Sequence, residues 1–252
     1  MRAPKPPLST LVNRMSAKPP LKVRMDERDL LILQHVARHR LTTCAVLHRH
    51  CFKELKRNAV LKILLRLCRE NLLQRFPLIY PEVYFTLTAK ACQLLGGVSA
   101  RSLPLGPQSL PSELAALHYC VCGSRYHKRL SKHEVQQTFS WFPKPSNHEI
   151  YSVDCANNNS PILEWLRADL GGPSHHIVRK THRRLSALGD SENAMAALNR
   201  QEFRVVFLTA TPEKARSIQR AVEPHEWPAS TQIHLAIIPE LVPLTTRYNH
   251  GT

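Results

Sequence analysis

Two aspartates in the second half of the chain have the spacing for metal-dependent chemistry. Asp154 ends one apolar run, Asp169 ends the next, and Lys180 follows in a helical segment. If both runs are strands whose ends meet at one sheet edge, the two carboxylates could share Mg²⁺, which prefers oxygen ligands. Lys180 would then stabilise a phosphate. Asp154, Asp169 and Lys180 are therefore the candidate catalytic residues of a phosphodiesterase, with Asp154 and Asp169 as its metal ligands.

A basic, leucine-rich run in the first half indicates a different chemistry, the binding of a polyanion. Its apolar residues recur at helical spacing and are expected to face a core, namely Leu61, Leu64, Leu65, Cys68 and Leu72. Cations on the other faces could neutralise phosphates or reach base edges. The candidate DNA-binding residues are Lys53, Lys56, Arg57, Lys62, Arg66, Arg69 and Arg75, with Arg179 and Arg183 of a later basic helix as a second contact. For both sets the alternative is a solvated basic face.

The net charge of +16 is distributed unevenly along the 252 residues. Residues 1–97 hold 18 Lys and Arg against 6 Asp and Glu, a net +12. Residues 98–252 hold 17 against 13, a net +4. This asymmetry predicts that the first half of the chain meets a polyanion such as double-stranded DNA.

The composition favours a reducing, cytoplasmic compartment. No apolar run approaches the roughly 20 residues that span a bilayer, and the cationic N-terminus lacks the apolar segment of a secretory signal. The seven cysteines are odd in number and irregularly spaced, which argues against a disulfide framework. We therefore expect a cytoplasmic protein with no membrane partner.

The elements that would position the first set of cations form a winged helix-turn-helix over residues 26–97. Helices are predicted at 26–39, 42–50 and 54–70, and a short one at 89–95. After the third helix the chain runs extended, breaks at Pro77 and Pro81, and returns as a strand over 83–88. A basic helix followed by a two-stranded hairpin is typical of a recognition helix and wing. Residues 1–25, basic and rich in proline, are expected to be a disordered arm.

The second half is predicted to be a mixed α/β domain that follows a linker over residues 98–111, where glycine and proline are frequent. Over residues 112–240, strands are expected at 134–142, 149–154, 162–169, 203–209 and 233–238, with helices at 113–122, 177–188, 192–200 and 213–222. Ser112 and Ser174 are the expected caps of two of these helices. Residues 241–252 are left as a tail, and the fold class of the whole chain is α+β.

Taken together, the two halves resemble the replication-relaxation family of bacterial plasmids and integrated mobile elements. In the first half the resemblance rests on residues 72–75 (LLQR) and 84–88 (YFTLT). In the second half it rests on His118, Asp154, the Arg-Ala-Asp run at 167–169, Lys180 and residues 205–209 (VVFLT). It covers roughly residues 26–222. The resemblance implies an N-terminal winged helix joined to a domain with a restriction-endonuclease-like core of the PD-(D/E)XK type.

Neighbouring residues argue against cleavage by such a domain. The nuclease pattern has an acid, any residue and then a lysine in the second strand, but Glu164–Trp165–Leu166 carries leucine in place of the lysine. The family often has an acid two residues before Asp169, where Arg167 would instead place a cation beside that carboxylate. Such an ion pair weakens metal binding. We therefore expect a nuclease-like scaffold that binds without cleaving, with no cofactor, and with Mg²⁺ only if the nuclease hypothesis holds.

These patterns predict a DNA-binding protein of a bacterial mobile element that acts in replication, mobilisation or transcriptional regulation. Two alternatives stay open. One is a Mg²⁺-dependent DNA endonuclease or nickase that uses Asp154, Asp169 and Lys180. The other is a non-enzymatic adaptor whose second domain binds a partner protein or forms a homodimer. The expected partners are double-stranded DNA and replication or mobilisation proteins.

Overall fold

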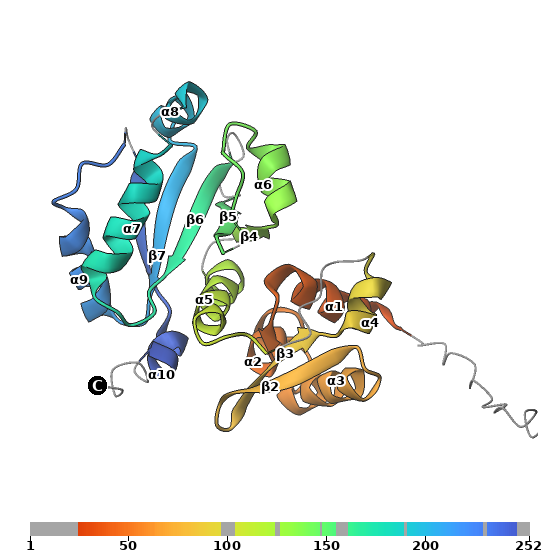
Figure 1. Ribbon diagram of the computed structural model, residues 1–252. Helices are drawn as coiled ribbons and strands as arrows, with labels where there is room; N and C mark the ends of the chain where they lie inside the picture. The colour runs from red at the N-terminus through yellow and green to blue at the C-terminus, as the bar shows by residue number, and fades with distance from the viewer. Residues whose placement is uncertain are drawn as a thin grey trace, which may run out of the picture.

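The computed structural model describes residues 25–96, 104–123, 127–146, 148–154, 161–188, 191–228 and 231–245. Nearly all of the predicted arm, the first part of the predicted linker and the end of the predicted tail therefore lie outside the described residues. The chain is mixed α+β with two sheets, as predicted at the level of class (Figure 1). We call residues 25–96 the N-terminal unit, and the described residues from 104 to 245 the C-terminal unit.

The N-terminal unit packs helices against a small antiparallel sheet with the strand order β1-β3-β2. Its elements are α1 (Glu27–His39), β1 (Thr42–Thr43), α2 (Cys44–His50), α3 (Arg57–Arg69), β2 (Leu73–Ile79), β3 (Glu82–Leu87) and α4 (Ala89–Leu94). Side-chain caps begin α1 at Asp26, α2 at Thr43 and α4 at Thr88. Apolar residues of α1, α3 and β3, among them Leu64 and Phe85, form the core of this unit.

Two features of this unit differ from the prediction. α3 begins at Arg57 rather than near residue 54, and its fully buried stripe is Val60, Leu64 and Leu67. The strand β2 continues through Pro77, which was expected to break it. Proline is tolerated here because β2 is an edge strand, where a missing N–H removes no necessary ladder hydrogen bond, and the pairing register shifts just after it.

The C-terminal unit is built on a five-stranded sheet with the order β4-β5-β6-β7-β8. Its strands are β4 (His127–Leu130), β5 (Ile150–Asp154), β6 (Ile162–Ala168), β7 (Phe203–Thr209) and β8 (Gln232–Ile237). Its helices are α5 (Ser109–Cys122), α6 (Lys132–Thr138), α7 (Ser174–Ser186), α8 (Glu192–Asn199), α9 (Pro212–Val222), the 3-10 helix η1 (Pro239–Leu241) and α10 (Val242–Thr245). The pairs β4–β5 and β5–β6 are antiparallel, whereas the pairs β6–β7 and β7–β8 are parallel.

Helices cover both faces of this sheet. Successive residues of a strand point to opposite faces. Trp165 and Phe207 accordingly join a core with α7 and α9, whereas Leu166 and Val206 join a core with α5. α5 thus covers one face, and α7 and α9 cover the other (Figure 1). None of the helices in the described residues is long and apolar enough to cross a membrane.

Several predicted elements of this unit are corrected by the structure. Much of the strand predicted at 134–142 is the helix α6, which begins with a capping box between Ser131 and Glu134. The strand β4 was not predicted, because it is four residues long and carries three basic side chains in place of an apolar pattern. The expected caps lie within helices instead: Ser112 is inside α5, and Ser174 is the first residue of α7.

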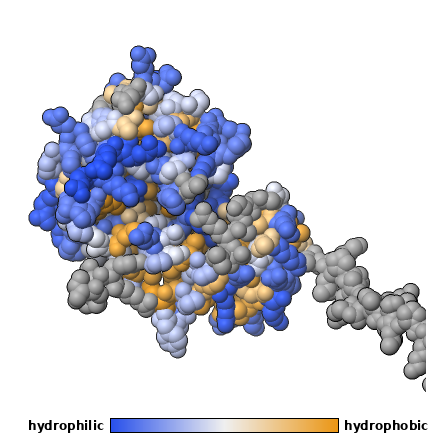
Figure 2. Space-filling view, in the orientation of Figure 1, coloured by the Kyte–Doolittle hydropathy of each residue, from blue (hydrophilic) through white to orange (hydrophobic). Residues whose placement is uncertain are grey.

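The two units share an apolar contact. Leu41, Val46 and Tyr84 of the N-terminal unit belong to one buried cluster with Leu117 of α5 and Leu241 of η1. Figure 2 shows apolar side chains gathered where the units meet, between more hydrophilic surfaces above and below.

An ion-pair cluster also joins the units. The buried carboxylate of Glu113 on α5 pairs with Arg40, the residue that ends α1, and with Arg129 of β4 at 2.6 Å. Arg38 of α1 pairs with Glu134 of α6 at 3.1 Å. The relative placement of the units is therefore specified by charged contacts as well as by apolar packing.

Candidate functional site

The predicted catalytic pair is separated in the structure. Asp154, at the end of β5, lies beside Ile162, at the start of the antiparallel strand β6. Asp169 follows the far end of β6, seven residues beyond Ile162, which corresponds to roughly 20 Å at 3.3 Å per residue. The expectation that the two carboxylates share a sheet edge is wrong, because successive antiparallel strands end at opposite edges. Asp154 and Asp169 therefore do not fit a shared Mg²⁺ site.

Asp169 has a different cationic neighbour from the one expected. Its buried carboxylate lies 3.7 Å from Nζ of Lys214 on α9. Burial raises the pKa of Asp169 above its usual range, and the charge of Lys214 opposes that shift. Arg167 instead donates from Nε to the hydroxyl of Thr181 on α7 at 3.2 Å, and its guanidinium lies over the ring of Trp165. The predicted Arg167–Asp169 pair is thus replaced by Lys214–Asp169.

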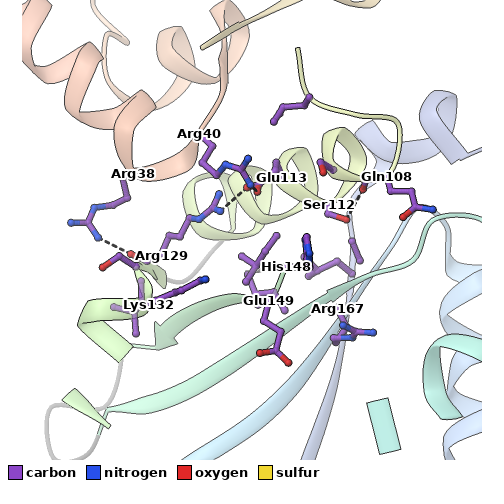
Figure 3. Close-up of a pocket in the computed structure, with 18 of the residues that line it drawn as sticks. Arg38, Arg40, Gln108, Ser112, Glu113, Arg129, Lys132, His148, Glu149 and Arg167 are labelled. Atoms are coloured by element: carbon purple, nitrogen blue, oxygen red, sulfur yellow. Dashed lines mark hydrogen bonds and ion pairs between the residues drawn. The ribbon is translucent and has the colours of Figure 1, made fainter. Parts of the chain in front are cut away.

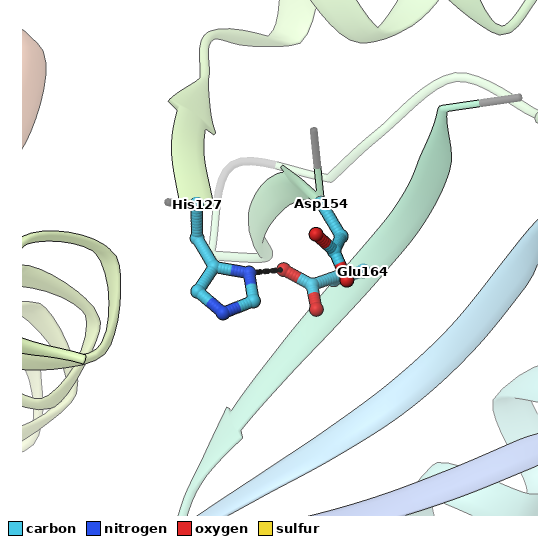
Figure 4. A group of neighbouring side chains, drawn as sticks. All are labelled: His127, Asp154 and Glu164. Carbon is cyan, nitrogen blue, oxygen red and sulfur yellow. Dashed lines mark hydrogen bonds and ion pairs between the residues drawn. The ribbon is translucent and has the colours of Figure 1, made fainter. Parts of the chain in front are cut away.

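Asp154 belongs instead to a buried polar network on the α5 face of the sheet (Figure 4). Its carboxylate accepts from Nη2 of Arg204 on β7 at 2.5 Å, and the same guanidinium contacts Glu164. Glu164 also lies 2.9 Å from Nδ1 of His127 and accepts from the hydroxyls of Ser152 and Tyr119 at 2.6 and 2.8 Å. The network therefore joins the four strands β4, β5, β6 and β7 to α5.

The electrostatics of this network favour a closed ion-pair cluster. Burial alone would raise the pKa of Glu164, but hydrogen bonds from His127 and Ser152 and the charge of Arg204 hold it below its usual range. Ligand atoms of His127, Asp154 and Glu164 lie within 4.8 Å of one another, a spacing that a metal ion could use. Arg204, however, already pairs with both carboxylates. Because its guanidinium lies where a cation would bind, and imidazole is not a preferred Mg²⁺ ligand, this cluster does not fit Mg²⁺ either.

The sequence contains a signal for this network. Glu164 and Arg204 are charged residues inside otherwise apolar strands, and both are almost fully buried. Buried charges are nearly always paired, so each predicts a partner of opposite sign. That the partner of Glu164 is Arg204, forty positions along the chain, follows from the parallel register of β6 and β7.

Most of the predicted DNA-binding residues of the N-terminal unit are exposed. They are Lys53, Lys56, Arg57, Lys62, Arg69 and Arg75. Arg57 pairs with Glu82 of β3 at 2.7 Å, and roughly half of each side chain is exposed. The other five form no ion pair with any acid of the described residues. Their charges are therefore available to an external anion.

Arg66 is the exception among these residues. Its guanidinium pairs with the buried carboxylate of Asp29 in α1, and with Glu70 at 3.3 Å. A hydrogen bond to Asp29 raises the pKa of Arg66 above its usual range. Arg66 therefore ties α3 to α1, and its charge is partly compensated within the unit, while its role as a DNA contact stays a prediction.

A shallow basic groove of about 590 Å³ separates α2 from the start of α3. Its lining includes His48, Arg49, Lys53 and Arg57. Arg49 was not among the predicted contacts, although it lies on the exposed side of α2. The groove extends the basic surface of α3 toward α2.

Arg179 and Arg183 are exposed on α7 in the C-terminal unit, one helical turn apart. Lys180, the third predicted catalytic residue, lines a cavity of about 1400 Å³ that both units enclose, and Arg167 and Asp169 line it too. We call this the interunit cavity. The structure thus brings Asp169 and Lys180 to one cavity and leaves Asp154 in the Arg204 network.

No family model, curated protein or solved structure matches this chain. The resemblance to the replication-relaxation family therefore stays a prediction. Function follows from the geometry and charge of the sites described above.

Proposed function

We propose that the N-terminal unit is a winged helix that binds double-stranded DNA through α3 and the β2–β3 hairpin. The order helix, short strand, helix, helix and hairpin supports this fold, as does the sheet order β1-β3-β2. α3 packs on α2 and β2 and lies on the side of the unit away from the five-stranded sheet (Figure 1). Its outer face is therefore open to a duplex.

The observation that carries the proposal is the imbalance between paired and unpaired charges. Four of the six acids of this unit pair with its own arginines, in the contacts Asp26–Arg28, Asp29–Arg66, Glu70–Arg66 and Glu82–Arg57. Five exposed cations named above have no such partner among the described acids. Each contact of this kind with a phosphate releases counterions and stabilises the complex.

The placement of the cations suits a major-groove complex. Lys56 and Arg57 lie at the start of α3, the end that contacts base edges in helix-turn-helix proteins. Lys62 and Arg69 lie further along its exposed side. Arg75 and Tyr80 of the hairpin, the latter 96% exposed, would contact the flanking backbone.

For the C-terminal unit we propose a nuclease-like core that binds without cleaving. The order α5, β4, β5, β6, α7 and β7, into which α6 and α8 are inserted, supports such a core, as do α5 and α7 on opposite faces. The guanidinium of Arg204 between the two carboxylates, and Leu166 in the apolar core beneath α5, support binding over cleavage. A role in replication, mobilisation or transcription of a mobile element rests on the family resemblance.

The test is fluorescence anisotropy of a labelled duplex of about 25 base pairs, titrated with the full chain at several salt concentrations without divalent metal. We expect affinity to fall steeply with salt. In the Lys62→Ala/Arg69→Ala variant the log–log salt slope should decrease by about 2, one unit for each lost phosphate contact.

The matched control is Arg216→Ala/Arg220→Ala, which removes two exposed cations from α9 in the C-terminal unit. This variant has the same net charge as the test variant. Equal affinities and slopes for the two variants would show that binding, if any, reflects net charge and not the α3 surface.

A further inference from the structure

The interunit cavity has a volume of about 1400 Å³, and its walls come from both units. α1, β3 and α4 of the N-terminal unit form one side. The edge of α5, the end of β6 and the first turns of α7 form the other. In Figure 3, Arg40 and Arg129 converge on Glu113, while Arg167 lies apart from them across the cavity.

The acids that line the cavity already have partners. Glu113 pairs with Arg40 and Arg129, and Glu134 pairs with Arg38. Glu149 accepts from Nε of Arg184 at 3.2 Å, from the Tyr151 hydroxyl at 3.0 Å and from the backbone N–H of Ser146 at 2.7 Å. The fourth acid, Asp169, pairs with Lys214.

Three basic side chains on the α7 side of the cavity form no ion pair with an acid in the described part of the chain. They are Arg167 from β6, and His176 and Lys180, which lie four residues apart on α7. The Arg167 guanidinium is half-buried between Trp165, 4.8 Å away, and the hydroxyl of Thr181. Burial lowers the pKa of the Arg167 guanidinium, and the charge of Glu149, which also pairs with Arg184, only partly opposes that shift. A bound anion would offset the remaining cost of burying this cation.

We propose that the interunit cavity binds a nucleoside phosphate, either free or at the 5′ end of a strand, with its phosphate on Arg167, His176 and Lys180. A planar guanidinium suits the oxygens of a phosphate monoester. The rest of the cavity offers amide and hydroxyl groups from Gln34, Gln108, Ser109 and Ser112, beside apolar walls that include Leu87 and Leu95. Apolar walls with a few polar groups are what a sugar and base need, and about 1400 Å³ accommodates them.

The buried indole of Trp165 beneath Arg167 gives the experiment a reporter. Full-length protein is titrated, without metal, with AMP and ATP, with adenosine, and with a 10-nucleotide single strand carrying either a 5′-phosphate or a 5′-hydroxyl. Tryptophan fluorescence and calorimetry are read together. We expect the phosphorylated probes to bind and adenosine and the 5′-hydroxyl strand to bind at least tenfold more weakly.

The choice of probes distinguishes a free nucleotide from the 5′ end of a strand as the source of the phosphate. Binding of the nucleotides assigns the cavity to a free ligand, and binding of the 5′-phosphorylated strand alone assigns it to a strand end. No saturable signal from any phosphorylated probe at about 1 mM overturns the proposal, and so does equal binding of adenosine and AMP.

Matched variants on one helix locate the site. Lys180→Ala should weaken binding about tenfold, the loss expected for one charge-assisted hydrogen bond. Arg179→Ala, which removes the neighbouring cation that does not line the cavity, should leave AMP binding unchanged. Equal effects of these two variants contradict the assignment.

The second variant pair separates this site from the α3 surface. Arg167→Lys keeps the charge but loses the planar fork, and its thermal midpoint reports whether the fold is intact. In folded protein it should bind the nucleotide several-fold more weakly. The Lys62→Ala/Arg69→Ala variant should bind nucleotide normally. The proposal for the cavity and the proposal for the α3 surface can therefore be contradicted independently of each other.

Discussion

Arg204 on β7 donates to Glu164, the residue directly beside it on β6, through Nε at 2.8 Å and through Nη2 at 2.5 Å. Both side chains are almost completely buried beneath α5. The same guanidinium reaches Asp154, so one cation compensates two carboxylates. Arg204 thus supplies beside these carboxylates the positive charge that a metal ion would supply in a nuclease. Its contacts also join β5, β6 and β7 beneath α5.

Replacing Arg204 should therefore destabilise the C-terminal unit strongly. Arg204→Met leaves two buried carboxylates without their cation, and we expect a loss of about 3–5 kcal/mol in the free energy of unfolding, measured with urea. Arg200→Met, at an exposed pair with Glu202, is the control and should change stability by less than about 0.5 kcal/mol. A loss below about 1 kcal/mol for Arg204→Met would mean that the buried pair does not hold the sheet.

Acid should weaken the fold partly through Glu134. Burial opposes ionisation of this carboxylate, but hydrogen bonds from Ser131 and the charge of Arg38 lower its pKa from 4.5 to about 2. A lowered pKa in the folded state means that the unfolded chain binds more protons. The stabilisation is therefore complete above pH 4.5 and is lost as the pH falls toward about 2.

The pH dependence can be isolated with Glu134→Gln. Urea unfolding at pH 7, 4 and 3 should show a smaller loss of stability on acidification in this variant than in the unchanged chain. Glu54→Gln, at an exposed residue without an ion pair among the described residues, is the control and should retain the full acid dependence. Parallel stability profiles for Glu134→Gln and the unchanged chain would contradict the assignment.

Elements with both a periodic apolar pattern and a cap could be predicted from the sequence. α9 is one example, because Thr211 caps it and Pro212 occupies its first position, where the missing N–H is not needed. The strand β7 could be predicted for a different reason, because a nearly continuous apolar run is typical of a central, buried strand. The strand β4 was not predicted, and α6 was predicted as a strand, because the side chains of both elements are mostly polar. Their positions depend on contacts with α1 and β5.

The candidate site could be predicted only in part, because strand direction is not encoded in side-chain alternation. Asp154 and Asp169 both end strands, but the sequence does not say that β5 and β6 run in opposite directions. The pairing of Glu164 with Arg204 likewise depends on the register of two strands separated by the whole of α7 and α8. The interunit cavity depends on how the two units pack, which no local pattern records.

Substitutions at Arg66 and Lys62, both on α3, should affect stability and DNA binding separately. Arg66→Ala leaves Asp29 buried without its cation, so we expect a loss of about 2 kcal/mol in unfolding free energy. Lys62→Ala removes an exposed cation and should weaken duplex binding with stability unchanged within about 0.5 kcal/mol. Urea unfolding and anisotropy are measured on both variants. If the Arg66→Ala variant lost DNA affinity without losing stability, Arg66 would be a direct DNA contact.

The last prediction concerns DNA cleavage. Because β5 and β6 are antiparallel, Asp154 and Asp169 lie at opposite edges of the sheet, and Arg204 occupies the carboxylates at the Asp154 edge. Supercoiled plasmid incubated with the full chain and Mg²⁺ or Mn²⁺ should therefore remain supercoiled on an agarose gel, under conditions where a nicking enzyme relaxes it. If nicking is seen, Asp154→Asn and Asp169→Asn are compared at equal concentrations of folded protein. Loss of nicking in both variants would require the two carboxylates to act together. The antiparallel register of β5 and β6 excludes this, so that result would contradict the pairing of these two strands.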